Sequence, residues 1–353
     1  MTGVLFHGPE VFDSGWAGRI IRAFSGRSRP RLMLAGAMSR TALLDSGIKG
    51  VETPGLQPSQ CVKLLEKDCS AALLATFSKS AHSGLVFGSL VAGRAAFSVP
   101  LVQAECSGPV YSEQSGACPA AVITKLEKLG FCRSEAPQAG VELWTRKGLS
   151  YRRMTTAEKG DFVFLNGIVV GRALGSGVVF VSKDRSITGI RGVRIKPHSL
   201  EKLERLGGVD LASAKLASTR RLRSIGARAR VQNIAGRGVA FIDHAGMESH
   251  KLAGGAEGAV TVGDDTTAVA GDILYRFGIP VIGIVDGDGD GVIVETKLYP
   301  GSTVFTVKAD DLAGLEVFRK IFAGKNRTRL SFAEVKAGVQ RIVAAKRISR
   351  MDY

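Results

Sequence analysis

Five aspartates in the C-terminal third of the chain have the spacing of a metal-binding site. They are Asp264, Asp265, Asp286, Asp288 and Asp290. Carboxylate oxygens are the ligands that Mg²⁺ and Mn²⁺ prefer, and these ions keep positions open for phosphate. Unit charges about 6 Å apart repel by ~3 kcal/mol per pair at an effective dielectric near 20. A cluster held that close therefore needs a cation, raised pKa values or solvent.

The residues around these aspartates predict a strand, a helix and a second strand. Short apolar runs predict strands at Val260–Val262 and Val281–Val285. Apolar residues at i, i+4 and i+8 predict a helix over Thr266–Phe277 between them. A βαβ unit of this length makes its two strands parallel neighbours. Because ligands of open α/β sheets bind beyond the carboxyl ends of the strands, we expect both acidic groups at one edge.

Four other side chains are candidates for ligand binding. Thr266 and Thr267 come at the start of the predicted helix, where hydroxyls and backbone N–H groups could donate to a phosphate. His244 follows the predicted strand Val239–Ile242, and an imidazole beside carboxylates suits a transition metal. His7 follows an apolar run near the N-terminus and could contact an anionic ligand. The alternative for His244 is a loop histidine that binds no ligand. The alternative for His7 is a loop histidine that is hydrogen-bonded to a carbonyl.

Simpler explanations of the acidic stretch stay open. Asp-Gly repeats are common in turns, and Asp265 could do no more than cap its helix. The run from Asp286 to Gly291 matches the first half of an EF-hand calcium loop. Lys297, however, stands at the twelfth position, where that loop needs a bidentate glutamate. The EF-hand is disfavoured, which leaves a metal or phosphate site and a solvated acidic loop as the alternatives.

The composition is that of a folded and strongly basic protein. The chain has 353 residues, of which 45% are hydrophobic, and a formal net charge of +16. This length predicts more than one domain, and the charge favours a polyanionic partner, either nucleic acid or a phosphorylated small molecule. We see no signal peptide, and the apolar stretch Leu85–Gly93 is too short to span a membrane. We therefore expect a cytoplasmic protein without membrane contact, and the oligomeric state stays open.

The cysteines give a second, weaker metal alternative. There are five of them, and they form no C-x-x-C pair. This pattern fits reduced cytosolic thiols, with a metal site built from Cys106, Cys118 and Cys132 as the alternative.

The order of predicted elements divides the chain into three regions. Residues 1–135 alternate strands and helices as an N-terminal α/β domain, and residues 136–200 form a β-rich module in which Asn166-Gly167 marks a hairpin. Residues 201–353 form a C-terminal α/β domain that carries the acidic site. The fold class is therefore α/β, with two parallel-sheet (Rossmann-like) regions separated by a small β-rich module.

Helices and a basic tract connect the last two regions. We predict helices over Ser199–Leu206 and Leu211–Leu222. The tract either tracks phosphates or forms a solvated surface, and it lacks the aromatic residues that would stack on bases. Its cations are Lys215, Arg220, Arg221, Arg223, Arg228 and Arg230.

Three motifs resemble an uncharacterised archaeal family that is found chiefly in methanogens and is known as a domain of unknown function. The first is His7-Gly8-Pro9-Glu10 with Asp13-Ser14-Gly15, and the second is Gly263-Asp264-Asp265-Thr266-Thr267. The third is Leu274-Tyr275-Arg276-Phe277-Gly278-Ile279-Pro280, which leads to Asp286-Gly287-Asp288. The resemblance covers most of the chain and implies an archaeal cytoplasmic protein.

A second resemblance is to Toprim domains, which bind magnesium for phosphoryl chemistry through an acid after one strand and Asp-x-Asp after a later one. Asp286 and Asp288 match the Asp-x-Asp. The earlier acid is Asp264 or Asp265 where that fold has Glu, and it lies only one helix away.

The sequence thus favours metal-dependent phosphoryl transfer or phosphoester hydrolysis with Mg²⁺ or Mn²⁺ held by the five aspartates. A non-catalytic protein that binds RNA or an anionic ligand, or an accessory protein, is the alternative, and whether the chain is an enzyme stays open. No dinucleotide-binding G-x-G-x-x-G follows a strand, and no Walker motif occurs.

Overall fold

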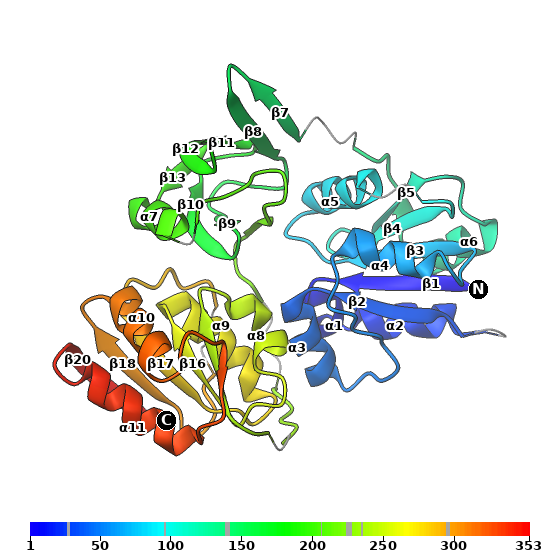
Figure 1. Cartoon of the computed structure of the whole chain (residues 1–353). Coiled ribbons are helices and arrows are strands. Elements are labelled where there is room, and N and C mark those ends of the chain that lie inside the picture. The colour runs from blue at the N-terminus through cyan, green and yellow to red at the C-terminus, as the bar shows by residue number, and fades with distance from the viewer. Residues whose placement is uncertain are drawn as a thin grey trace. The chain divides into compact units, whose positions relative to one another are not determined.

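The alternating strands and helices of the N-terminal region build one six-stranded sheet, sheet A, in this computed structural model (Figure 1). Its order is β2-β1-β3-β4-β5-β6, with β1 to β4 parallel and β5 antiparallel to β4. The strands are β1 (Thr2–His7), β2 (Arg31–Ala35), β3 (Ala71–Thr76), β4 (Leu101–Glu105), β5 (Val110–Ser115) and β6 (Cys132–Arg133). The structure describes residues 1–26, 29–94, 97–137, 142–205, 207–223, 228–233, 236–293 and 297–353.

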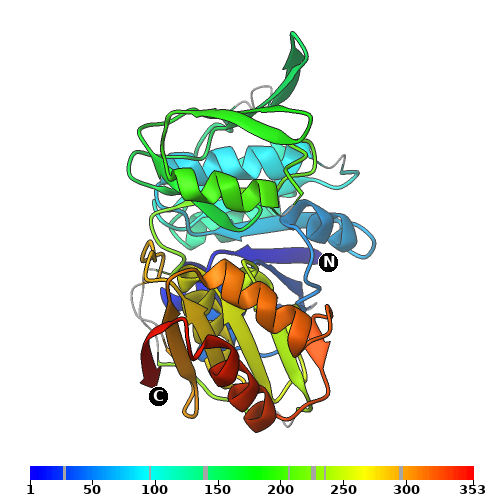
Figure 2. The same ribbon diagram turned by 60° about the vertical axis from the view of Figure 1, so that its left-hand side comes forward.

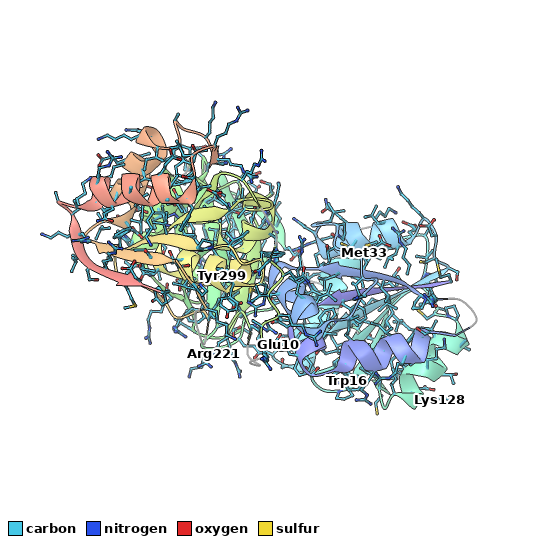
Figure 3. The ribbon with its side chains drawn as sticks, turned by 90° about the horizontal axis from the view of Figure 1, so that it is seen from below. Glu10, Trp16, Met33, Lys128, Arg221 and Tyr299 are labelled. Atoms are coloured by element: carbon cyan, nitrogen blue, oxygen red, sulfur yellow. The ribbon has the colours of Figure 1, made fainter. Side chains whose placement is uncertain are left out.

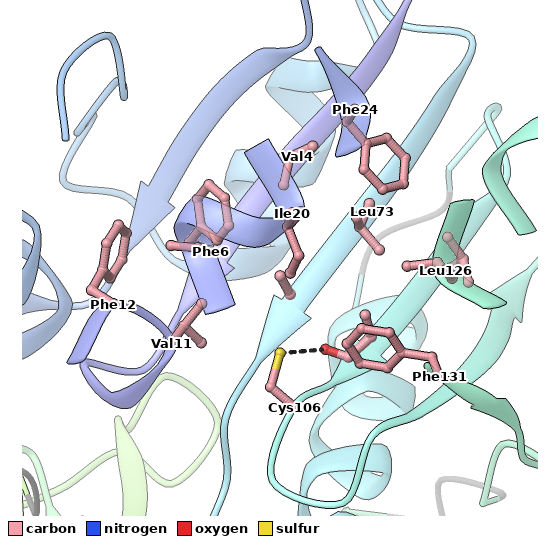
Figure 4. Close-up of a cluster of buried hydrophobic side chains, with 14 of the residues drawn as sticks. Val4, Phe6, Val11, Phe12, Ile20, Phe24, Leu73, Cys106, Leu126 and Phe131 are labelled. Carbon is pink, nitrogen blue, oxygen red and sulfur yellow. Dashed lines mark hydrogen bonds between the residues drawn. The ribbon is translucent and has the colours of Figure 1, made fainter. Parts of the chain in front are cut away.

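Helices cover both faces of sheet A, as its fully buried central strands β3 and β4 require. The helices are α1 (Glu10–Asp13), α2 (Trp16–Phe24), α3 (Ala37–Ser46), α4 (Pro58–Leu65), α5 (Ala81–Gly93) and α6 (Ala120–Lys128). One core joins Val4, Phe6 and Leu73 of the sheet to Ile20 of α2 and Leu126 of α6 (Figure 4).

The two helices of this core lie next to each other. Figure 3 shows α2, marked by Trp16, beside the end of α6, marked by Lys128. The Trp16 ring packs against Phe131 with the ring centroids 4.8 Å apart. A separate core under α4 and α5 closes the opposite face of the sheet.

Two glycines let α5 approach buried polar side chains of β4. A methyl group at Gly88 would lie 1.8 Å from Gln103 Oε1, and one at Gly84 would lie 2.0 Å from Glu105 Oε2. Gln103 cannot retreat, because its amide donates to Thr76 Oγ1 and Gly84 O, both at 2.8 Å, in a fully buried position. These close contacts therefore fix the position at which α5 packs on the sheet.

Gly88→Ala should destabilise the protein by about 1–3 kcal/mol, because the added methyl overlaps a fixed amide. Gly93→Ala, on the same helix, meets open space and should be neutral or stabilise by up to about 1 kcal/mol. Urea unfolding followed by circular dichroism measures both changes. Equal stability of the two variants would contradict this packing.

The β-rich module consists of two four-stranded sheets with a shared core. Sheet B has the order β12-β11-β8-β7 and sheet C the order β13-β10-β9-β14. Sheet B contains β7 (Leu143–Arg146), β8 (Leu149–Met154), β11 (Val178–Lys183) and β12 (Ser186–Arg191). Sheet C contains β9 (Phe162–Leu165), β10 (Ile168–Ala173), β13 (Val193–Ile195) and β14 (Leu216–Thr219), and α7 (Pro197–Arg205) packs on it. Asn166 and Gly167 have φ of 52° and 90°, which confirms the predicted hairpin.

The prediction of a helix over Leu211–Leu222 is wrong. Residues 216–219 form β14, which pairs antiparallel with β9. The open edge of β9 offers hydrogen bonds to this segment, and such tertiary pairing overrides a weak helical pattern.

Arg223, placed by sequence in the basic tract, is instead a buried cross-link of the N-terminal unit. Its guanidinium contacts Asp13 at 2.6 Å and Asp45 at 2.7 Å, and all three side chains are buried. Burial alone would lower the pKa of Arg223, but hydrogen bonds to both carboxylates outweigh it and raise the pKa. Arg223 therefore fits neither interpretation of the basic tract, because it belongs neither to a surface that tracks phosphates nor to a solvated surface.

Arg223→Leu should lower the free energy of unfolding by about 3–5 kcal/mol, because it leaves two buried carboxylates without this cation. Arg220, three residues earlier, is 64% exposed and pairs with Glu158. Arg220→Leu should lower the free energy of unfolding by less than about 1 kcal/mol. Thermal and urea unfolding of the two variants compares them, and a loss at Arg223 no larger than at Arg220 would contradict the buried cross-link.

The C-terminal region forms a second six-stranded sheet, sheet D, of order β19-β15-β16-β17-β18-β20. Strands β15 to β18 are parallel, and β19 and β20 are antiparallel edges. The strands are β15 (Val239–Asp243), β16 (Gly258–Val262), β17 (Val281–Val285), β18 (Thr303–Val307), β19 (Arg327–Thr328) and β20 (Arg347–Asp352). The helices are η1 (Gly246–Glu248), α8 (Ser249–Leu252), α9 (Asp264–Tyr275), α10 (Asp310–Lys320) and α11 (Phe332–Val343).

Helices α8 and α9 pack on one face of sheet D, and α10 and α11 pack on the other (Figure 2). The predicted βαβ unit is confirmed as β16, α9 and β17, with β16 and β17 paired in parallel. Gly263, rather than an aspartate, is the N-cap of α9, so Asp264 lies inside the helix. A capping box of Ser331 and Glu334 opens α11, as the S-x-x-E spacing in the sequence indicates. The run Ile293–Glu295 is typical of a strand in sequence, and it lies mostly outside the described residues.

The structure confirms the α/β class, with two sheets that contain parallel strands and two antiparallel sheets. The chain divides into two compact units, residues 1–227 and residues 228–353. Over the described ranges, no helix combines the length and apolar character needed to cross a membrane.

Candidate functional site

Acidic residues follow every parallel strand of sheet D. Asp243 ends β15, Asp264 follows β16, Asp286 follows β17, and Asp310 opens the helix after β18. Because the four strands are parallel, their carboxyl ends meet at one edge of the sheet.

Three of these carboxylates come together. Asp264, Asp286 and Asp310 each offer an oxygen, and the three oxygens lie within 4.8 Å of one another. Asp310 is almost fully buried, and the other two are half-buried. These residues come from three neighbouring strand ends, so the sheet itself fixes their spacing.

Backbone donors of the loop after β17 hold the carboxylates in place. Asp264 Oδ2 accepts hydrogen bonds from the N–H groups of Asp286 at 3.1 Å and Gly287 at 3.0 Å. The N–H of Asp288 donates to Asp286 Oδ1 at 3.3 Å, and that of Asp290 donates to Asp265 Oδ1 at 3.2 Å. Asp265 and Asp290 are thus linked to each other, outside the group of three.

Glycines allow this loop to fold over the start of α9. A methyl group at Gly289 would lie 3.0 Å from Asp264 Cβ, which is tighter than ordinary contact. Gly287 has φ of 87°, a conformation that side chains disfavour. The Asp-Gly repeat is therefore required by the close approach of the loop to Asp264.

His244 lies beside the acidic group. Its Nδ1 contacts Asp243 Oδ1, and its Nε2 lies 3.5 Å from Asp311 Oδ1. A methyl group at Gly263 would lie 3.6 Å from His244 Nε2, so the ring sits over the residue that precedes Asp264. The backbone of His244 has φ of 50°, in the left-handed region that few side chains adopt.

The two threonines at the start of α9 are directed inward. Thr267 Oγ1 lies 2.8 Å from Thr261 Oγ1 in the buried core, and a methyl group at Gly283 would lie 2.6 Å from Thr267 Cγ2. Thr266 is also buried. Their role as phosphate ligands stays a prediction, and the hydroxyl of Thr267 already has a protein partner.

Two acidic residues of this edge were not predicted from the sequence. Asp310 and Asp311 follow β18 (Thr303–Val307) by three and four residues. The same rule that selected Asp264 and Asp286, acids directly after a parallel strand, would have selected them.

The three candidate cysteines show no sign of a shared site. Cys106 is buried, Cys118 half-buried and Cys132 exposed. They do not belong to any group of metal-ligating atoms within 4.8 Å in the part of the chain that the structure describes.

His7 belongs to sheet A, in the other compact unit from the aspartates. Its Nδ1 lies 3.2 Å from Ala35 O, so Nδ1–H donates to that carbonyl. The ring stacks on Phe87 with centroids 4.6 Å apart. Burial lowers the pKa of His7 from 6.5 to about 4, against a smaller opposing effect of the Ala35 hydrogen bond. His7 is therefore a carbonyl-bonded histidine, and its role as a ligand for an anion stays a prediction.

His7 should make the protein less stable as pH falls from about 6.5 to 4. In this range the unfolded state binds the proton and the folded state does not, so up to about 3 kcal/mol is lost by pH 4. Partial exposure of the ring reduces that figure. His7→Gln should flatten the dependence of unfolding free energy on pH in this window, whereas His82→Gln, at an exposed histidine, should not. Parallel pH profiles for the wild type and His7→Gln would contradict this prediction.

Comparison with known proteins places the chain in a family. The profile of a family described as an uncharacterized protein conserved in archaea matches residues 4–325. The uncharacterized protein MJ0065 of Methanocaldococcus jannaschii is 31% identical over 319 residues, which cover 87% of this chain and 86% of the relative. No solved structure matches the chain, so the resemblance to Toprim domains stays a prediction. The archaeal resemblance is confirmed, and the chain belongs to the archaeal protein family DUF2117.

Proposed function

We propose that the acidic edge of sheet D binds a divalent metal ion and supports phosphoryl transfer or phosphoester hydrolysis. The observation that carries this proposal is the convergence of Asp264, Asp286 and Asp310, whose oxygens lie within 4.8 Å of one another. Like charges gathered from three strand ends repel one another, and this repulsion costs free energy that a bound cation would offset. A divalent cation would turn their repulsion into attraction.

The donors fit a small, hard cation. All three are carboxylate oxygens, which suit Mg²⁺ and Mn²⁺. The oxygens of Asp264, Asp286 and Asp310, which lie within 4.8 Å of one another, are the groups that would hold such an ion. Three protein ligands leave positions for water and for substrate oxygens.

Such an ion neutralises phosphoryl oxygens and lowers the pKa of bound water. The protein's own groups supply orientation and proton handling. The loop N–H groups hold Asp264 by two hydrogen bonds, which leaves its other oxygen, Oδ1, for the ion. His244, with Asp243 on Nδ1, has its Nε2 on the side of Gly263 and could carry a proton to or from a reacting oxygen.

The chemistry of the chain favours a phosphorylated substrate over a neutral one. The net charge of +16 attracts anions over long distances, although the acids themselves are negative. The first turn of α9 begins at this edge, and helix N-termini favour phosphate. Substrate class is therefore proposed as a phosphomonoester or phosphodiester.

Isothermal titration with MnCl₂ and MgCl₂ tests the metal site. We expect binding to the full chain, weakened about tenfold or more in Asp286→Asn and in Asp310→Asn, because each removes a charged ligand. Asp290→Asn is the matched control, since Asp290 lies in the same loop but outside the group of three. Hydrolysis of p-nitrophenyl phosphate and of bis(p-nitrophenyl) phosphate then tests the chemistry, with Mn²⁺-dependent release lost in the same two variants.

Absence of metal binding, or equal binding by all four proteins, would overturn the site. Metal binding without release from either ester would leave a structural ion and overturn the proposed reaction. Folding of each variant is checked by circular dichroism, because Asp264 and its neighbours also organise the loop.

A further inference from the structure

Sheet B carries a stacked aromatic pair on its outward face. Trp144 of β7 stands opposite Tyr151 of β8, and their rings are stacked with centroids 5.4 Å and planes 6° apart. Arg153 lies over the Trp144 ring, 5.4 Å from its centroid. Residues two apart in a strand share a face, so Arg146 lies on this face with them.

In β8 and the neighbouring β11, the alternate residues face the core. Arg152 turns inward and donates to the carbonyls of Leu211 and Ala214. Met154 and Phe180 belong to the buried core of the module. Trp144 and Tyr151 are only half-buried and stand outside that core. Large aromatic side chains on an outer face are available for contact with a partner.

The surroundings of the pair are strongly basic. Residues 143–154 and 178–191 contain seven lysines and arginines and one acid, Asp184. Among the described residues, none forms an ion pair with Arg146, Lys147, Arg153 or Arg191, and all four are exposed. Arg153 and Arg191 flank Val179 across three adjacent strands, roughly 10 Å apart. Together, Trp144, Arg146, Lys147, Tyr151, Arg153 and Arg191 form the basic aromatic face.

The hairpin of β7 and β8 presents this face rigidly. It projects from the rest of the β-rich module in both ribbon views (Figures 1 and 2). Lys147 and Gly148 have φ of 51° and 73°, the two-residue turn that matches the twist of paired strands. The aromatic rings and cations are thus positioned before any partner binds, which lowers the entropic cost of binding.

We propose that the basic aromatic face binds single-stranded RNA. Unpaired bases stack on exposed aromatic rings, and arginine and lysine contact the phosphates between them. A duplex hides its bases from such rings, and an acidic protein would use the cations but not the stacked pair. RNA loops and ends are the main source of unpaired bases, so RNA is the assigned partner. This site is separate from the acidic edge of sheet D and independent of the proposed reaction.

Fluorescence anisotropy with a labelled oligouridine of about 12 nucleotides tests the proposal on the full chain. Replacing both aromatics, Trp144→Ala with Tyr151→Ala, should raise Kd about tenfold or more. Arg146→Gln with Lys147→Gln should weaken binding and reduce the slope of log Kd against log salt by about 1.4, at about 0.7 for each lost phosphate contact. Lys67→Gln with Lys128→Gln removes the same charge from exposed lysines outside sheet B and should leave Kd nearly unchanged.

A second measurement does not depend on truncating the pair. The chain has two tryptophans, so in Trp16→Phe only Trp144 emits, and RNA should quench its fluorescence. The conservative change Tyr151→Phe keeps the ring and should keep the affinity.

Lack of quenching, or an unchanged Kd in the folded aromatic double variant, would overturn the proposal. So would tighter binding of an RNA duplex or of single-stranded DNA of matched sequence. Competition by polyglutamate as effective as that by RNA would instead assign the face to an acidic protein.

Discussion

Repulsion between carboxylates is the constraint around which the C-terminal unit is built. Parallel strands put Asp264, Asp286 and Asp310 at one edge of sheet D, with oxygens within 4.8 Å of one another. At such distances unit charges repel by roughly 3–4 kcal/mol per pair at an effective dielectric near 20. The fold offsets part of this cost with backbone N–H groups of the loop after β17, two of which donate to Asp264. Glycines in that loop are what let its backbone come close enough to donate.

The N-terminal unit treats buried charge differently, as Glu105 and Arg223 show. Glu105 is fully buried and accepts hydrogen bonds from Thr76 Oγ1 and from the N–H groups of Ser78 and Ser107. Arg223 is matched by two carboxylates. Both charges thus have partners from the protein itself. The acidic edge of sheet D is the opposite case, since it brings like charges together from three neighbouring strand ends, which is why we propose the chemistry there.

Local sequence patterns predicted the elements that form through interactions between residues close together in the sequence. The strands and helix around Asp264 and the Asn166-Gly167 hairpin follow from short-range spacing and turn chemistry, and the structure confirms them. Strand β14 could not be predicted this way, because residues 216–219 are extended only through pairing with β9. The ion pairs of Arg223 were equally hidden, since nothing near it in sequence indicates Asp13 or Asp45. Asp310 is a different case, because its position after β18 carried the signal and the rule was not extended to that strand.

The position of Arg223 in the chain has a consequence for how the N-terminal unit is made. Its partners lie 210 and 178 residues earlier, so they are synthesised long before their cation. Until Arg223 leaves the ribosome, the carboxylates of Asp13 and Asp45 cannot be buried without a large cost, and the contact between α1 and α3 that surrounds them stays open to water. A nascent chain that ends before Arg223 therefore lacks the cation that pairs with both of these carboxylates.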